Sequence, residues 1–198
     1  MTKQELAALW ETFFESKNWE PLPYQKKAFD RIFNGYNGLV NAPTGSGKTY
    51  SLLLPLFLKG LQLKHQKGLF AIWITPLRAI AQEIKESAEE LSTFYSLNWD
   101  IQIRTGDTDT KTRQKQLRNP PQVLITTPES IHLILASKQY QSFFKRIRFF
   151  VVDEWHELLG SKRAVQVELA LSRLKTIAPR LKIWGISATI GNLEQGMQ

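Results

Sequence analysis

The sequence contains no cysteine, so it can form neither a disulfide framework nor a thiolate metal site. It has no apolar run long enough to span a bilayer, and its polar N-terminus lacks the apolar stretch of a signal peptide. Low-complexity tracts and internal repeats are absent as well. These absences favour an ordinary globular protein in the cytoplasm, without a membrane partner.

Acidic residues are in short supply relative to basic ones. The 26 Lys and Arg residues outnumber the 18 Asp and Glu residues, which gives a net charge of +8. This excess suits a polyanionic partner such as nucleic acid, although many globular domains are basic without a specific partner. The length of 198 residues, 42% of them apolar, allows one domain with a proper core.

Helical and strand-like segments alternate along most of the chain. Apolar residues recur at helical spacing between Leu6 and Phe14, and a later predicted helix contains Pro55, which should kink it or cut it short. The predicted helices cover residues 3–16, 24–33, 47–58, 77–94, 111–118, 130–137 and 161–177. The predicted strands cover residues 38–41, 69–75, 100–105, 123–126, 147–153 and 182–187.

Several predicted strands are continuous apolar runs, as in residues 71–74, 149–152 and 183–186. Such runs are expected for parallel strands that are covered by helices on both faces. We therefore predict an α/β fold with a mostly parallel, twisted sheet and helices on both sides. Polar residues follow these strands, at the carboxyl ends where ligands bind in such sheets.

Residues 42–49 read Ala-Pro-Thr-Gly-Ser-Gly-Lys-Thr and follow a predicted strand. A glycine-rich loop of this kind can wrap its backbone N–H groups around a polyphosphate. Lys48 would contact the β- and γ-phosphates, and the Thr49 hydroxyl would bind Mg²⁺. Four further residues would complete the backbone cradle: Thr44, Gly45, Ser46 and Gly47.

A second cluster of polar residues follows the apolar strand at residues 149–152. Asp153 can hold Mg²⁺ through water, and Glu154 can orient or deprotonate the attacking water. His156 comes directly after this pair, and we interpret it as functional although a lone histidine is usually structural. Together with the phosphate loop, these residues predict the binding and hydrolysis of a nucleoside triphosphate.

Five motifs in this order resemble those of the superfamily-two helicases. Ala42 stands where the common phosphate-loop pattern has glycine, as it does in these helicases. The remaining matches are motif Ia at residues 75–80, motif Ib at 127–129, a DExH box at 153–156 and motif III at 187–189. An unrelated phosphate-loop protein, such as a nucleotide kinase, is the alternative, and five ordered matches argue against it.

The resemblance narrows to the large helicase-related (Lhr) group, and within it to the ligase-associated DNA-damage-response DEXH-box helicases. The segments that carry it are residues 104–108 (RTGDT), 126–130, 153–163 (DEWHELLGSKR) and 187–193 (SATIGNL). It implies a RecA-like phosphate-loop lobe that uses ATP and Mg²⁺. It also implies a helicase or translocase that moves 3′ to 5′ on single-stranded DNA in DNA repair.

The resemblance assigns roles to single residues as well. Gln25 resembles the Q-motif glutamine that reads the adenine edge, with a solvated helix residue as the alternative. His156 would couple the γ-phosphate to Ser187 and Thr189. The nucleic-acid candidates are Arg78, Gly106, Asp107, Thr127 and Glu129, with ordinary strand-to-helix turns as the alternative. Residues 162–163 (Lys-Arg) are a further candidate contact.

We expect N-terminal helices with the Q-motif-like segment at residues 1–36, packed on an ATP-binding lobe at residues 37–198. Nothing that resembles motifs IV to VI follows Thr189. We therefore expect a second RecA-like lobe elsewhere in the parent chain, and the resemblance implies a DNA ligase or repair assembly as a partner.

Two alternatives remain open: an RNA helicase lobe, and a nucleotide- or nucleic-acid-binding module without turnover. For the isolated chain we expect weak ATP binding, little strand-stimulated hydrolysis and no unwinding, because arginine fingers from a second lobe would be missing.

Overall fold

Six parallel strands form the central sheet of the computed structural model, which describes residues 1–43 and 45–188 and only the backbone of Arg78. Their order in the sheet is β1-β6-β5-β2-β4-β3, and every neighbouring pair is parallel. The predicted α/β class with a mostly parallel sheet is confirmed. The strands are β1 (Gly38–Asn41), β2 (Ala71–Ile74), β3 (Ile101–Arg104), β4 (Val123–Thr126), β5 (Phe149–Val152) and β6 (Lys182–Ser187).

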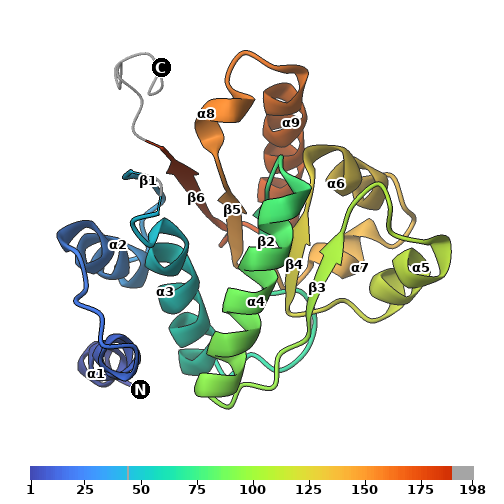
Figure 1. Ribbon diagram of the computed structural model, residues 1–198. Coiled ribbons are helices and arrows are strands. Elements are labelled where there is room, and N and C mark those ends of the chain that lie inside the picture. The colour runs from blue at the N-terminus through green and yellow to red at the C-terminus, as the bar shows by residue number, and fades with distance from the viewer. Residues whose placement is uncertain (44, 189–198) are drawn as a thin grey trace.

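Helices cover both faces of this sheet (Figure 1). On one face lie α1 (Lys3–Ser16), α2 (Pro23–Phe33), α3 (Lys48–Gln62) and α4 (Arg78–Phe94). On the other lie α5 (Thr110–Arg118), α6 (Pro128–Leu135), α7 (Tyr140–Phe144), α8 (Trp155–Leu158) and α9 (Lys162–Ile177). Among the described residues, no helix is both long enough and apolar enough to cross a bilayer.

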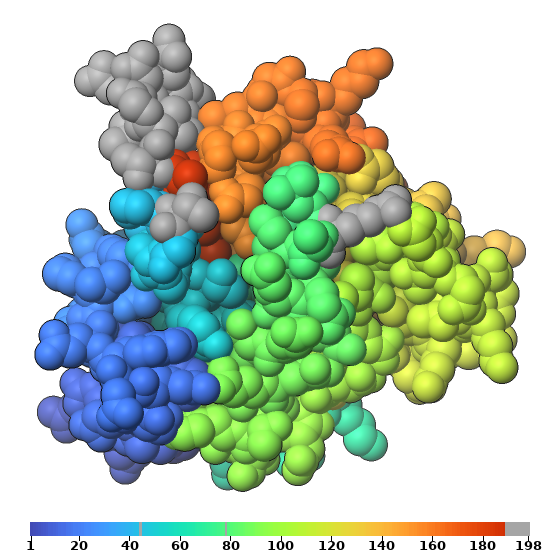
Figure 2. All heavy atoms as spheres, in the orientation of Figure 1, coloured from blue at the N-terminus to red at the C-terminus, as the bar shows by residue number. Residues whose placement is uncertain are grey.

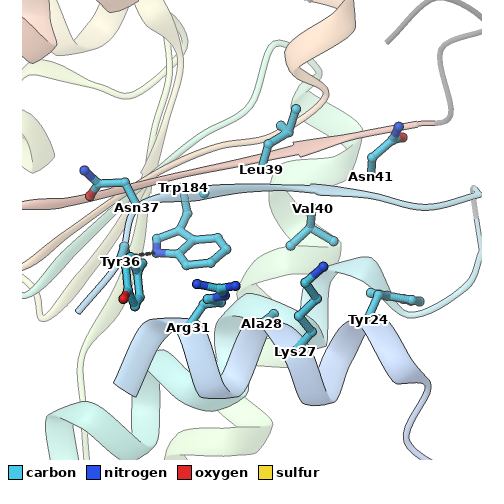
Figure 3. A pocket seen from close by; sticks show the side chains of 11 residues that line it. Tyr24, Lys27, Ala28, Arg31, Tyr36, Asn37, Leu39, Val40, Asn41 and Trp184 are labelled. Atoms are coloured by element: carbon cyan, nitrogen blue, oxygen red, sulfur yellow. Dashed lines mark hydrogen bonds between the residues drawn. The ribbon is translucent and has the colours of Figure 1, made fainter. Parts of the chain in front are cut away.

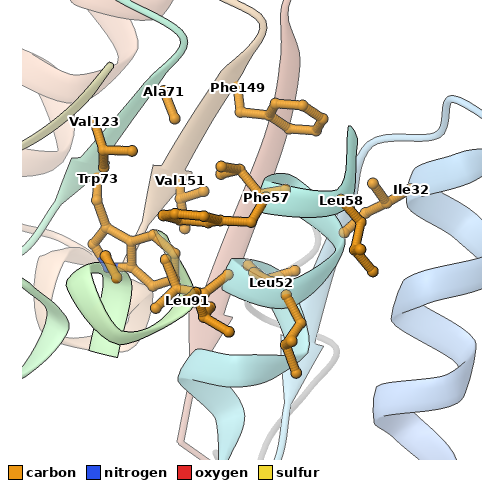
Figure 4. Close-up of a cluster of buried hydrophobic side chains, with 14 of the residues drawn as sticks. Ile32, Leu52, Phe57, Leu58, Ala71, Trp73, Leu91, Val123, Phe149 and Val151 are labelled. Carbon is orange, nitrogen blue, oxygen red and sulfur yellow. The ribbon is translucent and has the colours of Figure 1, made fainter. Parts of the chain in front are cut away.

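The apolar strands divide their side chains between two cores because successive side chains of a strand point to opposite faces. In β2, Trp73 packs into the core beneath α3 and α4, while Ile72 and Ile74 pack into the core beneath α6 and α9. Figure 4 shows Trp73 and Val151 of the sheet against Phe57 of α3. Both faces are therefore apolar, which explains the continuous runs in the sequence.

The two N-terminal helices pack against each other through an aromatic cluster. Trp10 lies 4.6 Å from Phe14 and 5.5 Å from Phe29 between ring centroids, and all three rings are buried. A capping box of Thr2 and Glu5 begins α1. Residues 1–36 thus contribute to the same core as the sheet, and a boundary at residue 36 stays a prediction.

Helix α3 corrects one expectation from the sequence. Pro55 was expected to kink or shorten the helix, yet α3 continues through it to Gln62, so the shortened helix is wrong. Proline removes one backbone hydrogen bond, but Leu52, Leu56 and Phe57 around it are fully buried. Tertiary packing of this apolar face outweighs the local cost. The short helices α7 and α8 were not predicted, because each has too few residues to show a helical period.

Gly60 of α3 offers a test of this packing. A Cβ atom at this position would lie 2.1 Å from Cη2 of the buried Trp99. We expect Gly60→Ala to lower the free energy of unfolding by about 1–3 kcal/mol, despite alanine's better helix propensity. Urea denaturation measures this. In a Trp99→Leu background the same change should be neutral or stabilising, and an equal loss in both backgrounds would contradict the assignment.

Candidate functional site

The phosphate loop and the DExH segment meet at the carboxyl edge of the sheet because β6 lies between β1 and β5. A cavity of about 280 Å³ opens there. Lys48 and Thr49 line it from the start of α3, and Asp153 and Glu154 line it from the end of β5. Residues more than a hundred positions apart in the sequence therefore share one site.

The phosphate loop has the backbone that its glycines permit. Gly45 and Gly47 have φ angles of +77° and +78°, in the left-handed region that favours glycine. Gly47 is also the N-cap of α3, so the N-terminus of that helix faces the loop. Ser46 is fixed within the loop, because its hydroxyl donates to the Pro43 carbonyl at 2.6 Å. Thr44 lies outside the described residues.

Two neighbouring residues of α2 hold this loop from behind. The Tyr24 hydroxyl donates to the Ser46 carbonyl, and the Gln25 Nε2 donates to the Gly47 carbonyl at 3.1 Å. The Gln25 Oε1 in turn accepts the Leu22 N–H at 2.8 Å. Gln25 is only 4% exposed, so it is not a solvated helix residue. The loop and the first turn of α2 form one hydrogen-bonded unit.

Lys48 is the buried cation of the site. Its side chain ends in an Nζ atom that has no hydrogen-bond partner among the described residues, and the residue is 7% exposed. Burying an ammonium group costs free energy unless an anion accompanies it. The position at the first residue of α3, beside the glycine-rich loop, suits the phosphates of a nucleotide.

Asp153 is the buried anion of the site. Its Oδ2 accepts the Trp73 Nε1–H at 3.1 Å, and its Oδ1 accepts the Glu154 N–H at 2.9 Å. Burial raises the pKa of Asp153 to about 6, while these two hydrogen bonds and the nearby Lys48 oppose the rise. Trp73 is therefore a core residue that also orients this carboxylate.

Glu154 has an unusual backbone for its residue type. Its φ of 47° and ψ of 48° lie in the left-handed region, which costs a non-glycine residue about 1–2 kcal/mol. Its Oε2 atom is buried and forms no hydrogen bond within the described residues. The strained turn places this carboxylate on the wall of the cavity.

His156 joins the DExH segment to the end of β6. Its Nδ1 accepts the Ala188 N–H at 3.3 Å and lies 3.3 Å from the Ser187 hydroxyl. Because Nδ1 accepts there, it cannot donate to Glu154 Oε2, although the two atoms are 3.3 Å apart. The structure thus brings His156 and Ser187 together, as expected, and Thr189 lies outside the described residues.

The nucleic-acid candidates lie farther along the same edge, beyond β2, β4 and β3. Thr127 caps α6 by accepting the Ser130 N–H at 3.3 Å, and Glu129 forms an ion pair with Arg163 at 2.7 Å. The Gly106 carbonyl accepts Arg113 Nη2 at 2.6 Å. The Asp107 N–H donates to the Thr105 hydroxyl at 3.4 Å. Arg78 begins α4, and its side chain is not described.

A second cavity, of about 400 Å³, lies between α2 and the outer strand β1. Lys27 and Arg31 point from α2 towards β1, and the Trp184 Nε1 donates to the Tyr36 carbonyl at 3.1 Å (Figure 3). Tyr24 lines this cavity too and reaches the phosphate loop. None of the residues predicted for the site lines this cavity.

The sequence matches the DEAD/DEAH box helicase family over residues 22–195. The chain belongs to this family. It is 34% identical to the ATP-dependent helicase Lhr-Core protein 2 of Thermococcus barophilus, over 92% of this chain and 23% of that protein. It is 37% identical to the ATP-dependent helicase Lhr-Core of Sulfolobus acidocaldarius, over 92% of this chain and 22% of that protein.

Solved structures of helicases in this family have the same fold. Mycobacterium smegmatis helicase Lhr bound to ssDNA and AMP-PNP aligns with a TM-score of 0.81 and 32% identity, over 96% of this chain and 25% of that chain. DEAD-box helicase Mss116 bound to ssRNA and UDP-BeF aligns with a TM-score of 0.78 and 26% identity, over 87% and 36%. The chain spans about a quarter or less of the curated relatives. The resemblance to Lhr helicases and the RecA-like fold are confirmed.

One wall of the cavity beside the phosphate loop was not predicted from the sequence. Helix α4, which follows motif Ia, presents Ile80, Glu83, Ile84 and Ser87 to the cavity. Their spacing of three and four residues is that of one helical face, and this period is visible in the sequence. What the sequence could not show is that this face lies over the phosphate loop.

The buried carboxyl group of Asp153 predicts a pH-dependent stability. Its folded-state pKa of about 6 exceeds the ordinary aspartate pKa of 3.8, so its contribution to stability is present below pH 3.8 and is lost as the pH rises through 6. Asp153→Asn removes this loss of stability, because asparagine does not ionise. Without metal or nucleotide, we expect it to be more stable than wild type by about 1–3 kcal/mol at pH 7.5, with no advantage at pH 3.5.

Urea denaturation at several pH values measures this difference. Glu168→Gln, on the exposed surface of α9, serves as the control for removal of a carboxylate. An Asp153→Asn protein that is less stable than wild type at pH 7.5 would show that the two hydrogen bonds of Asp153 outweigh its desolvation.

Proposed function

We propose that this chain is the ATP-binding first lobe of an Lhr-type, ATP-dependent DNA helicase or translocase. One observation carries the proposal. A buried, unpartnered Lys48 ammonium and the two carboxylates of Asp153 and Glu154 line one cavity with the phosphate loop. Membership of the DEAD/DEAH box helicase family supports it. The oppositely charged groups suit a magnesium-bound triphosphate better than any neutral ligand.

The phosphates of ATP would take the place beside the loop. The N–H groups of Gly45, Ser46 and Gly47, together with Thr44, would cradle them, and Lys48 would contact the β- and γ-phosphates. Glu154 would orient or deprotonate the attacking water. His156 would relay the state of the γ-phosphate to Ser187 and, beyond it, to Thr189.

Thr49 and Asp153 would hold Mg²⁺. The donor set fits this ion, since both offer oxygen and both line the cavity that contains the unpartnered Lys48. The described residues hold no cluster of three or more acidic, His or Cys side chains that could bind a metal alone. That agrees with Mg²⁺, which usually takes one or two protein carboxylates and completes its shell with waters and phosphates. When bound, Mg²⁺ neutralises phosphate charge.

The adenine would lie in a neighbouring cavity of about 590 Å³. Trp19, Gln25 and Tyr50 line it beside the loop residues 45–47. Trp19 is 46% exposed and lies edge-on to Tyr50, 5.5 Å between centroids, so one face can receive a base. Gln25 would read the adenine edge with the second N–H of its amide and the second lone pair of its amide oxygen, since its two hydrogen bonds use only one of each.

A single DNA strand would run along the carboxyl edge past β2, β4 and β3. Arg78, Gly106, Asp107, Thr127 and Glu129 mark that path. Cationic, hydroxyl and backbone N–H groups along it would position a strand without reading its bases. DNA is favoured over RNA because Mycobacterium smegmatis Lhr, seen with ssDNA, shares 32% identity against 26% for Mss116, seen with ssRNA. Binding should then be sequence-independent and fall steeply with salt.

The wider biology is proposed on resemblance alone. It comprises 3′-to-5′ movement, DNA repair, a second RecA-like lobe, a DNA ligase or repair assembly and a cytoplasmic location. An RNA helicase lobe is the second candidate function, and matched DNA and RNA strands distinguish them. A requirement for the 2′-hydroxyl would favour RNA.

Lys48→Ala tests the nucleotide site. We expect the affinity for ATP to fall at least about tenfold, because a charge-assisted phosphate contact is lost. Fluorescence titration with a labelled ATP measures it. Lys59→Ala removes a lysine from the same helix, where Nζ donates to Gln62 outside the cavity, and should bind normally. Equal affinities for the two variants would place the triphosphate elsewhere.

Trp19→Ala tests the adenine pocket. We expect ATP affinity to fall about three- to tenfold, since stacking of a base on an aromatic ring contributes about 1–3 kcal/mol at most. Affinity for inorganic triphosphate should not change. Because Trp19 is half exposed, its loss should leave the fold intact, which circular dichroism checks. An equal fall for both ligands would contradict the pocket.

Glu154→Gln distinguishes an enzyme from a binding module. In the longer parent polypeptide, hydrolysis should collapse while ATP binding persists, because the amide cannot take a proton. In the isolated chain, hydrolysis should be slow and little stimulated by DNA. Robust DNA-stimulated turnover by the isolated chain would contradict the need for a second lobe.

A further inference from the structure

An exposed ion pair links motif Ib to the helix that follows the DExH box. Glu129 Oε1 accepts Arg163 Nε–H at 2.7 Å, and both side chains are 48% exposed. Glu129 lies in the first turn of α6, and Arg163 lies in the first turn of α9. Figure 2 shows the orange atoms of α8 and early α9 beside the yellow atoms of α6 on the upper rim.

Arg163 stands at a position that is unfavourable for a cation. The N-terminal end of a helix carries partial positive charge, and the first turn of α9 has Lys162 and Arg163 but no acidic residue. Stability alone would favour an acidic residue there. The pair also uses only Arg163 Nε, so both Nη groups lack a protein partner within the described part of the chain.

Glu129 stays ionised at neutral pH. Partial burial works to raise the pKa of Glu129, but its own backbone N–H, Arg163 and Thr127 outweigh burial and hold the pKa below its usual range. A bare carboxylate at this point of the rim would repel a nucleic-acid backbone. The ion pair therefore neutralises a charge that would otherwise oppose strand binding.

The pair is not needed to hold α6 against α9. His132 of α6 already bonds the Gln166 carbonyl of α9 through Nε2 at 2.8 Å. Beneath it, Ile131, Ile134 and Val167 are fully buried in one apolar core. A half-exposed ion pair adds at most about 1 kcal/mol to such packing. Its small contribution also means that little is lost if Arg163 changes partner.

We propose that Glu129 masks Arg163 in the free protein, and that a phosphodiester group of a bound strand takes Arg163 from Glu129. Arg163 is then a phosphate-binding residue, and Glu129 is its competitor. A guanidinium group can meet a phosphate with two parallel hydrogen bonds, against the single one in the ion pair. This inference rests on the proposed function, because it requires a strand along this rim.

The experiment is a fluorescence-anisotropy titration of the 198-residue chain with a labelled oligothymidylate at several salt concentrations. The variants are Glu129→Gln, Arg163→Gln and the double variant. Glu168→Gln and Arg180→Gln make the same charge changes at exposed positions of α9 and just beyond its far end. Thermal unfolding of every variant checks that the fold is retained.

We expect Glu129→Gln to bind about three- to tenfold more tightly than Glu168→Gln, since Arg163 is released. Arg163→Gln should bind about three- to tenfold more weakly than Arg180→Gln, and its salt slope should be shallower by about 0.7, one phosphate contact on a single strand. In the Arg163→Gln background, Glu129→Gln should strengthen binding by less than it does when Arg163 is present, because only the repulsion by the bare carboxylate is removed and the competition no longer exists.

Three outcomes would overturn the inference. If Glu129→Gln binds no better than Glu168→Gln, the pair has a structural role. If Glu129→Gln strengthens binding equally with and without Arg163, simple repulsion explains the effect. If Arg163→Gln keeps the wild-type salt slope, Arg163 touches no phosphate. A wild-type chain that binds no strand even at low salt would instead remove the proposed function itself.

Discussion

The site depends on two opposite charges that are buried in one cavity and only partly compensated. Lys48 has no hydrogen-bond partner for its ammonium group within the described residues, and burial lifts the pKa of Asp153 to about 6. Each group costs free energy in the ligand-free fold, and the sheet and helices around them supply it. A nucleotide that brings both negative phosphates and a divalent cation satisfies the two groups at once. The ligand-free fold is therefore already preorganised to favour a ligand that carries both phosphates and a divalent cation.

Strand order converts this local chemistry into one site. The phosphate loop, the DExH segment and Ser187 follow β1, β5 and β6, and these three strands are neighbours although they are far apart in the chain. The candidate strand-binding residues follow β2, β4 and β3 on the same edge. His156 links the first group to β6, and the Glu129–Arg163 pair links α6 to the helix behind the DExH box. Short contacts thus join both groups to the DExH segment or to the helix that follows it.

The sequence predicted what is local and repetitive. Residues 3–16, 38–41, 123–126 and 182–187 were predicted with the bounds that the structure shows, because their apolar period or run is unambiguous. The motif residues could be assigned because ordered matches reinforce one another. Long-range contacts could not be predicted from the sequence. They include the hydrogen bond from Trp73 to Asp153, the position of one α4 face over the phosphate loop, and the ion pair of Glu129 with Arg163. The expectation for Pro55 was wrong because the sequence shows the local cost of proline in a helix but does not show the packing that outweighs it.

The outer strand β1 has a pairing partner on one side alone among the described strands. Its free edge exposes backbone groups that another copy could extend into a continuous sheet. Lys27 and Arg31 point from α2 towards this strand, so two molecules that met edge to edge would bring four cations closer together. Coulombic repulsion of this kind fades as counterions accumulate. Self-association of the chain should therefore strengthen as the salt concentration rises. Under the same conditions its affinity for a nucleic acid should be lowest.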